Sequence, residues 1–193
     1  MAKVVGIDPG TGSMDLLGLD DTSMRVFLDV SIPRQRVTQN PSIILEVLED
    51  AGGEGLDAIV APSGYGIPLK RVQEASEGEI VEASFMHSSD RRRHQIIGLR
   101  QLMMMLKRSR LKAWFTPGVI HLQTVPRYRK MWRIDIGTAD KVYTVAAALR
   151  DEVERHGTPL HEADFIVVEA GMAYNAAIAV VGGRIVDGIG GTT

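Results

Sequence analysis

Two segments of the chain place an acidic residue and glycines directly after a short apolar run. The first follows residues 4–7 and has the sequence Asp8-Pro9-Gly10-Thr11-Gly12-Ser13. Gly10 and Gly12 allow backbone N–H groups to approach a ligand closely, and Thr11 and Ser13 add hydroxyl donors. Asp8 suits a hard cation such as Mg²⁺ that arrives with an anion. A glycine-rich hairpin with a structural aspartate has the same pattern, and spacing alone does not separate the two interpretations.

The second segment repeats this layout near the C-terminus. An apolar run at 165–168 is followed by Glu169, by Gly171 and then by another pair of predicted strands. Two such units at opposite ends of one chain would hold a metal-bound polyphosphate from two sides. The second segment lacks small hydroxyl residues, and Tyr174 and Asn175 are poor substitutes for them, so a plain β-hairpin is the competing interpretation.

The elements that must position these segments alternate between strands and helices, which predicts an α/β fold. Helices are expected from the Asn40-Pro41 start to Gly52, from Asp90 to about Lys112, and from the Thr138 cap to Gly157. A short helix is also predicted at 69–75. Strands are predicted at 4–7, 14–19, 25–30, 56–61, 80–85, 165–168, 176–181 and 184–186.

Length and composition exclude several classes of protein. The 193 residues are enough for one good-sized domain or for one domain and part of another. The absence of cysteine excludes disulfides, thiolate nucleophiles and Cys-ligated metals. No apolar run reaches the roughly 18 residues of a membrane span, and the acid at position 8 comes too early for a secretory signal. We therefore expect no membrane partner and a cytoplasmic location.

The charge is unevenly distributed along the chain. Residues 91–133 contain 12 lysines and arginines and no acidic residue, although the whole chain has a net charge of only -2. This segment would suit phosphate, nucleic acid or an acidic partner, or it faces the acidic remainder of its own chain, which we favour. The chain has no nucleic-acid motif, so nucleic acid is not an expected partner. Arg127 and Arg129, next to Tyr128, are candidates for binding a substrate anion.

Histidine and serine residues give weaker signals. His121 lies in an apolar run that we interpret as a strand, and it is either a substrate contact or a hydrogen-bonded structural residue. His156 and His161 are too loosely arranged for a metal site. Ser63 lacks the glycine that precedes the nucleophile of a hydrolase elbow, so a hydrolase is not proposed.

These motifs together resemble those of a known superfamily. Asp8-x-Gly10-Thr11-x-Ser13 before a three-strand meander is similar to the first phosphate motif of the actin, heat-shock ATPase and sugar- or acetate-kinase (ASKHA) superfamily. Glu169-x-Gly171, with strands ending at Asp187-Gly188-Ile189-Gly190-Gly191, resembles its second phosphate motif. The stretch between them includes Val119-Ile120-His121-Leu122 and Gly137-Thr138-Ala139-Asp140-Lys141. It resembles an uncharacterised, mainly archaeal branch described as predicted butyrate kinases, and the resemblance runs from residue 3 to the end.

The resemblance implies a ribonuclease-H-like, actin-type ATPase fold with two lobes. Residues 1–164 would form the first lobe, and residues 165–193 would open a second lobe with a hairpin. ATP and Mg²⁺ would bind between the lobes, with Asp8 and Glu169 facing the metal. The phosphates would face Gly10, Thr11, Gly12, Ser13 and Gly171. Asp140 would orient or deprotonate the acceptor, or merely stabilise the helix N-terminus, and Lys141 would neutralise phosphate.

The expected function is therefore that of a sugar- or carboxylate-kinase-like phosphotransferase that uses ATP and a small-molecule acceptor. Family members are longer and carry the adenosine site in the second lobe, so we expect this chain to be incomplete for catalysis. The edge after Gly191 favours pairing with a missing C-terminal lobe or with a second copy. The alternatives are a non-catalytic nucleotide sensor or scaffold, and an anion- or nucleic-acid-binding module that uses residues 91–133.

Overall fold

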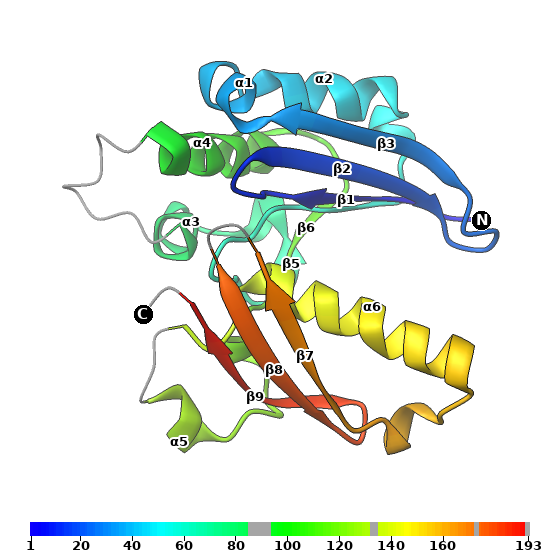
Figure 1. Cartoon of the computed structure of the whole chain (residues 1–193). Coiled ribbons are helices and arrows are strands. Elements are labelled where there is room, and N and C mark those ends of the chain that lie inside the picture. Colours follow the sequence, from blue (N-terminus) through cyan, green and yellow to red (C-terminus); the bar gives the residue numbers. More distant parts are fainter. Residues whose placement is uncertain (85–93, 132–134, 172–173, 192–193) are drawn as a thin grey trace. The chain divides into compact units, whose positions relative to one another are not determined.

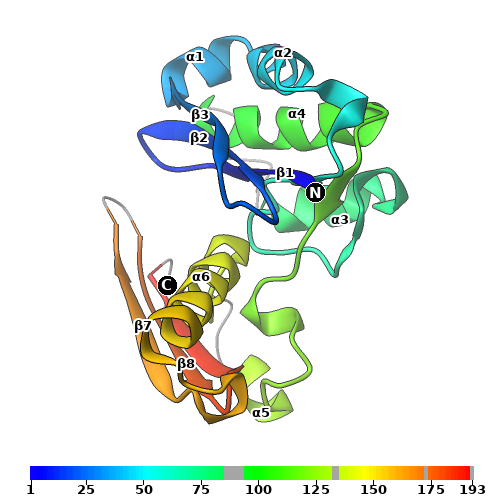
Figure 2. The same cartoon turned by 90° about the vertical axis from the view of Figure 1, so that its right-hand side faces the viewer.

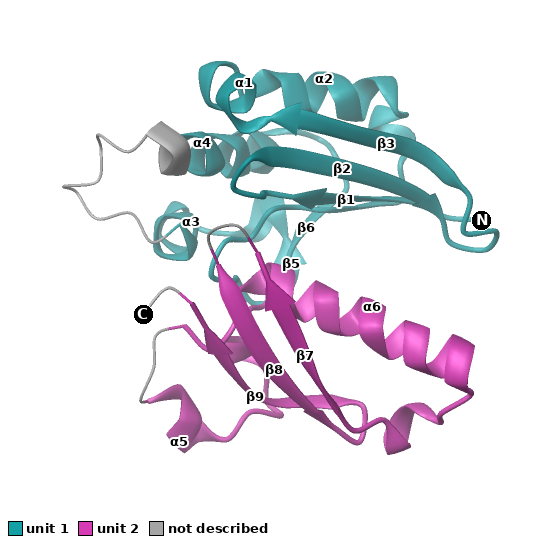
Figure 3. Cartoon of the chain, in the orientation of Figure 1, with its two compact units in different colours: residues 1–116 teal, residues 117–193 magenta. Residues whose placement is uncertain are grey.

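The computed structural model describes residues 1–84, 94–131, 135–171 and 174–191. The chain forms two compact units, Met1–Thr116 and Pro117–Thr193, each with its own sheet and its own hydrophobic core (Figure 3). The predicted helix cap at Asp90, three arginines of the basic segment and the pair Trp132 and Arg133 lie outside the described residues. No helix in the described ranges combines the length and the apolar character that a membrane span needs.

Unit 1 contains a six-stranded mixed sheet with the strand order β3-β2-β1-β4-β6-β5 (Figure 1). The first three strands form the predicted antiparallel meander, whereas β1, β4 and β6 run parallel and β5 pairs antiparallel with β6. The strands are β1 (Lys3–Asp8), β2 (Ser13–Asp20), β3 (Val26–Pro33), β4 (Ala58–Val60), β5 (Lys70–Arg71) and β6 (Ala113–Phe115).

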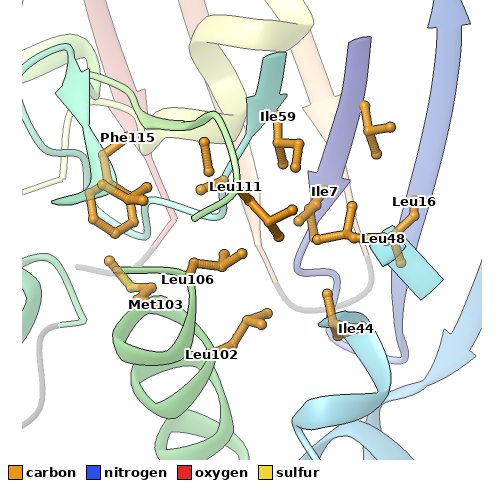
Figure 4. Packing of buried hydrophobic residues seen from close by; sticks show 14 of the residues in the cluster. Ile7, Leu16, Ile44, Leu48, Ile59, Leu102, Met103, Leu106, Leu111 and Phe115 are labelled. Atoms are coloured by element: carbon orange, nitrogen blue, oxygen red, sulfur yellow. The ribbon is translucent and has the colours of Figure 1, made fainter. Parts of the chain in front are cut away.

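Helices α1 (Arg34–Gln39), α2 (Ser42–Asp50) and α4 (His94–Arg108) belong to the same unit, and α2 and α4 supply much of its core. Alternate strand residues are buried in this core, as expected for a sheet with one face packed against helices. Ile7 and Leu16 lie with Ile44 and Leu48 of α2, and Leu106 of α4 belongs to the same cluster (Figure 4). Each such side chain contributes about 1.5–3 kcal/mol through burial.

Two predicted elements of unit 1 are wrong. The helix expected at 69–75 is instead the short strand β5 followed by a 3₁₀ turn, η2 (Val72–Glu74). The strand expected at 80–85 is the helix α3 (Glu77–Ala83). Ser76 and Glu79 form a capping box at its start, and the buried residues Ile80 and Ala83 are spaced as on one helix face.

Unit 2 has an antiparallel sheet of β7 (Phe165–Ala170), β8 (Asn175–Val181) and β9 (Arg184–Gly190). Helix α6 (Ala139–His156) lies along one face of this sheet (Figure 2). As predicted, α6 follows Thr138 and ends at Gly157, which has the left-handed conformation that favours glycine. Short turns complete the unit: η4 (Val119–His121), α5 (Arg127–Lys130) and η5 (Leu160–Glu162).

The boundary between the compact units lies between Thr116 and Pro117, earlier than the boundary expected between 164 and 165. The core of unit 2 explains this difference. Val119 of η4 and Val145 of α6 are buried in one cluster with Ile178 of β8, so the segment 117–164 packs with the C-terminal strands.

Candidate functional site

The acid–glycine turn of unit 1 joins β1 to β2. Asp8 is the last residue of β1, and its side chain is exposed. The Ser13 hydroxyl donates to Asp15 Oδ2 over 2.9 Å, and the Gly12 carbonyl accepts from the Arg34 backbone N–H over 2.9 Å. These contacts anchor the end of the turn that leads into β2, while Thr11 at its tip is exposed.

The topology of unit 1 brings a second loop to the edge where Asp8 lies. Because β1, β4 and β6 are parallel, their carboxyl ends share one edge of the sheet, which is the usual place for ligands in open α/β sheets. The loop 62–66 follows β4 at this edge. Its Ser63 is buried, and the Ser63 hydroxyl donates to the Ala61 carbonyl and accepts from the Thr116 N–H. The Ser63 hydroxyl thus joins the ends of β4 and β6.

In unit 2 the structure brings three predicted site residues together. The Lys141 ammonium lies 2.7 Å from Asp140 Oδ2 and forms a short ion pair with Glu169 Oε1. The other Glu169 oxygen, Oε2, accepts from the Thr144 hydroxyl over 2.9 Å. The Thr138 hydroxyl donates to Asp140 Oδ1. The first turn of α6 is therefore tied to the end of β7.

The electrostatics of this cluster favour a charged lysine. Burial lowers the pKa of the Lys141 ammonium, but the hydrogen bonds and charges of Asp140 and Glu169 outweigh it, so the pKa is raised above its ordinary value. The Lys141 side chain is only 7% exposed, whereas those of Asp140 and Glu169 are 37% and 33% exposed. The positive charge is buried and the carboxylates around it are partly hydrated.

The glycines of the second phosphate-like motif contact protein backbone and side chains closely. A Cβ at Gly188 would overlap the Ile136 carbonyl, and one at Gly190 would overlap the carboxylate of the buried Asp135. Asp135 Oδ1 also accepts from the Gly137 N–H over 3.0 Å. Sequence reasoning did not single out Asp135, which helps to fix the segment that leads into α6. The sequence feature that could have identified Asp135 is an acidic residue directly before an apolar residue and Gly137.

Gly171 closes the turn between β7 and β8. Its N–H donates to the Tyr174 carbonyl over 3.0 Å, and a Cβ at this position would lie 2.8 Å from the same oxygen. The two residues between them lie outside the described ranges.

The predicted substrate residues lie elsewhere in unit 2. Arg129 forms an ion pair with Asp187 over 3.4 Å and lies over the Tyr128 ring. This pair borders an open pocket of about 550 Å³. The pocket is lined by Tyr128, Arg129, Ile136, Ile166, Ala177, Ala179, Asp187, Gly188 and Ile189. Ile166 and Glu169 are an odd number of residues apart on β7, so the pocket and the Lys141 cluster lie on opposite faces of the sheet.

The remaining two candidates, Arg127 and His121, lie in the same segment of unit 2 as Arg129. Arg127 is exposed at the start of α5. His121 lies in the 3₁₀ turn η4 and not in a strand, and its Nδ1 accepts from the Gly118 N–H over 3.3 Å. Desolvation of the ring lowers the pKa of His121. The histidine therefore has the hydrogen bond expected of a structural residue.

The predicted metal residues are divided between the units. Asp8 belongs to unit 1 and Glu169 to unit 2, so their joint contact with one metal stays a prediction. Among the described residues, no group of three or more His, Cys, Asp or Glu side chains is arranged to hold a metal ion.

Comparison with known proteins identifies a family and a fold. A family model described as a protein of unknown function (DUF1464) matches residues 6–193. No curated protein matches the chain.

Three solved structures share the fold at low sequence identity. The acetate kinase of Entamoeba histolytica is similar with a TM-score of 0.59 and 11% identity, over 100% of this chain and 56% of that one. The acetate kinase of Porphyromonas gingivalis is similar with a TM-score of 0.55 and 15% identity, over 100% of this chain and 58% of that one. A propionate kinase of Francisella tularensis is similar with a TM-score of 0.55 and 14% identity, over 99% of this chain and 58% of that one. The expected actin-type α/β ATPase fold is thereby confirmed, and the chain spans 56–58% of the length of these structures.

Proposed function

The chain belongs to the family of proteins of unknown function DUF1464. For this member of the family we propose the function of an ATP-dependent, kinase-like phosphotransferase. The observation that carries the proposal is the acid–glycine turn at residues 8–13. It follows the first strand of an acetate-kinase-like fold and lies at the carboxyl edge of the parallel strands.

Asp8 fits a magnesium ion that arrives with a nucleotide. Mg²⁺ in phosphoryl-transfer sites is usually held by one or two carboxylates together with substrate phosphates and water. A single exposed carboxylate next to the turn meets this requirement without a preformed cluster of protein ligands. When bound, Mg²⁺ supplies the positive charge that neutralises the transferring phosphoryl group.

The other residues of the turn would hold the phosphates. Gly10 and Gly12 leave room for the phosphates next to the backbone N–H groups, and Thr11 and Ser13 offer hydroxyl donors. Ser13 would turn its hydroxyl from Asp15 toward the phosphate, because the two are hydrogen-bonded in the structure. From unit 2, Gly171 would face the phosphates. Lys141 would neutralise phosphate only by exchanging its ion pair with Asp140, because the carboxylates of Asp140 and Glu169 together outweigh its single positive charge.

The acceptor we propose is a short-chain carboxylate. The names of the fold neighbours, acetate and propionate kinase, and the resemblance to predicted butyrate kinases support this choice. Arg127, Arg129 and His121 stay the predicted acceptor contacts. Arg129 pairs with Asp187 on the sheet face opposite Lys141, so an acceptor bound there would not meet a phosphate held at Lys141, and only one of these two assignments can apply. Since the neighbours are longer, we also propose that a complementing lobe holds the adenosine.

The test is transfer of phosphate from ATP to acetate, propionate or butyrate by the chain assembled with the proposed complementing lobe, with the acyl phosphate trapped by hydroxylamine. Asp8→Ala should reduce turnover by about 100-fold or more, the usual effect of removing a charge-stabilising group. The control is Asp29→Asn, an exposed aspartate of β3 in the same unit, which should leave turnover unchanged.

Two outcomes would favour the alternatives. Nucleotide binding without transfer to any acceptor would indicate a sensor or scaffold. If the affinity for polyanions falls steeply with salt concentration and is unchanged in Asp8→Ala, the result would indicate an anion-binding module that uses residues 91–133.

A further inference from the structure

We propose that the ammonium group of Lys141 takes the place of a divalent cation at Glu169. The cation that neutralises Glu169 is then a side chain of the same protein, and Glu169 holds this lysine and no metal ion. The inference refines the metal site of the proposed function and rests on that function only for the identity of the metal.

Both oxygens of Glu169 already have partners. Oε1 pairs with the Lys141 ammonium, and Oε2 accepts from the Thr144 hydroxyl over 2.9 Å. Mg²⁺ requires oxygen ligands at about 2.0–2.1 Å in near-octahedral geometry. A metal ion bound to Glu169 would therefore lie next to the ammonium, where the two like charges repel each other.

A second carboxylate completes the surroundings of the ammonium. Asp140 Oδ2 lies 2.7 Å from Lys141 Nζ, and its other oxygen accepts from the Thr138 hydroxyl. Two carboxylates and two hydroxyls are the kind of oxygen set that would otherwise attract a hard cation. Here the two carboxylates pair with a lysine side chain that is only 7% exposed, and the two hydroxyls donate to the carboxylates.

The fold places the lysine at this point with little freedom. Lys141 lies in the first turn of α6, and Thr144 follows it three residues later on the same helix face. Glu169 is near the end of β7, on the sheet face that packs against α6. A buried ammonium is stable only while its partners remain, so the lysine and both carboxylates form one unit.

The experiment measures Mn²⁺ binding by electron paramagnetic resonance without nucleotide, in an Asp8→Ala background that removes the other proposed metal contact. We expect no binding that depends on Glu169, so Asp8→Ala and Asp8→Ala/Glu169→Gln should have the same affinity. Adding Lys141→Met to Asp8→Ala should create a site that binds Mn²⁺ at least about tenfold more tightly, because the competing charge is gone. Adding Glu169→Gln to that variant should remove the site.

Two results would overturn the inference: a Mn²⁺ site in Asp8→Ala that Glu169→Gln removes, or no new site in a folded Lys141→Met variant. If Lys141→Met does not fold, paramagnetic broadening decides the question in the Asp8→Ala protein. Selective broadening of the Thr144 and Glu169 amides by Mn²⁺ would contradict the inference, and its absence would support it. Loss of the proposed kinase activity alone would not affect these results, which involve no nucleotide.

Discussion

At the scale of single residues, Lys141 links two elements of unit 2. It lies in the first turn of α6 and pairs with Glu169 of β7. Its partner Glu169 lies 28 residues away, and only the packing of α6 on the sheet joins the two. No local pattern carries that information, because the contact depends on where a helix crosses a strand.

The Lys141 cluster predicts a specific effect on stability. Lys141→Met should destabilise the fold by about 1–3 kcal/mol, less than for a fully buried pair because both carboxylates are one-third hydrated. Urea unfolding measures this change. Lys112→Met, a partly buried lysine of unit 1, is the matched control and should have little effect. An equal loss in both variants would mean that the cluster adds nothing.

The pH dependence of this stabilisation follows from the direction of the pKa shift. The pKa of Lys141 is raised in the folded state, so its stabilisation is fully present below the ordinary value of 10.5. It is lost as the pH rises through the higher folded-state value. The difference in stability between wild type and Lys141→Met should therefore be constant near neutral pH and shrink above about pH 10.5. A difference that stays constant in strong alkali would contradict this account.

At the scale of elements, strong local signals were sufficient for part of the fold. The first meander has apolar alternation and turn residues, and α6 has a cap, a periodic apolar face and a terminal glycine. The described part of the 69–85 region, residues 69–84, was predicted wrongly because short apolar runs fit helices and strands equally well. There the Ser76-x-x-Glu79 capping box was the informative signal.

The start of α3 yields a prediction in acid. Glu79 accepts hydrogen bonds from Lys70 and Ser76, and these lower its pKa from 4.5 to about 2. Because the pKa of the Glu79 carboxylate is lowered in the folded state, the carboxylate stabilises the fold above pH 4.5. This stabilisation is lost as the pH falls toward 2. Glu79→Gln should reduce this loss by at most about 1 kcal/mol, because solvent still reaches the two side chains of the ion pair, which are 26% and 30% exposed. Urea unfolding at pH 6 and pH 3 compares the variants, and equal pH dependence in both would refute the prediction.

The close approach of β9 to the segment before α6 gives a prediction for packing. Gly188→Ala should cost about 1–3 kcal/mol, because its Cβ would overlap the Ile136 backbone carbonyl, which has little freedom to move. Gly6→Ala in β1 is the control, since a Cβ there meets no atom within 4 Å. Thermal unfolding compares the two variants. A Gly188→Ala protein as stable as Gly6→Ala would show that this approach is not tight.

At the scale of the whole molecule, the sequence predicted the α/β class and the ATPase-type fold, and the comparisons confirm both. It did not predict that residues 117–164 pack with the C-terminal strands, because helical periodicity does not reveal which sheet a helix covers. The Arg129–Asp187 pair shows one basic residue of the 91–133 segment facing an acid of its own chain. That contact agrees with the intramolecular interpretation of the basic segment.

The central claim is that the turn at Asp8 binds a magnesium nucleotide. Isothermal titration calorimetry with a non-hydrolysable ATP analogue, with Mg²⁺ and then with EDTA, tests it most directly. We expect binding that requires Mg²⁺, is lost in Asp8→Ala and is kept in Asp29→Asn. Binding of equal strength in wild type and Asp8→Ala, or binding that does not depend on Mg²⁺, would contradict the claim.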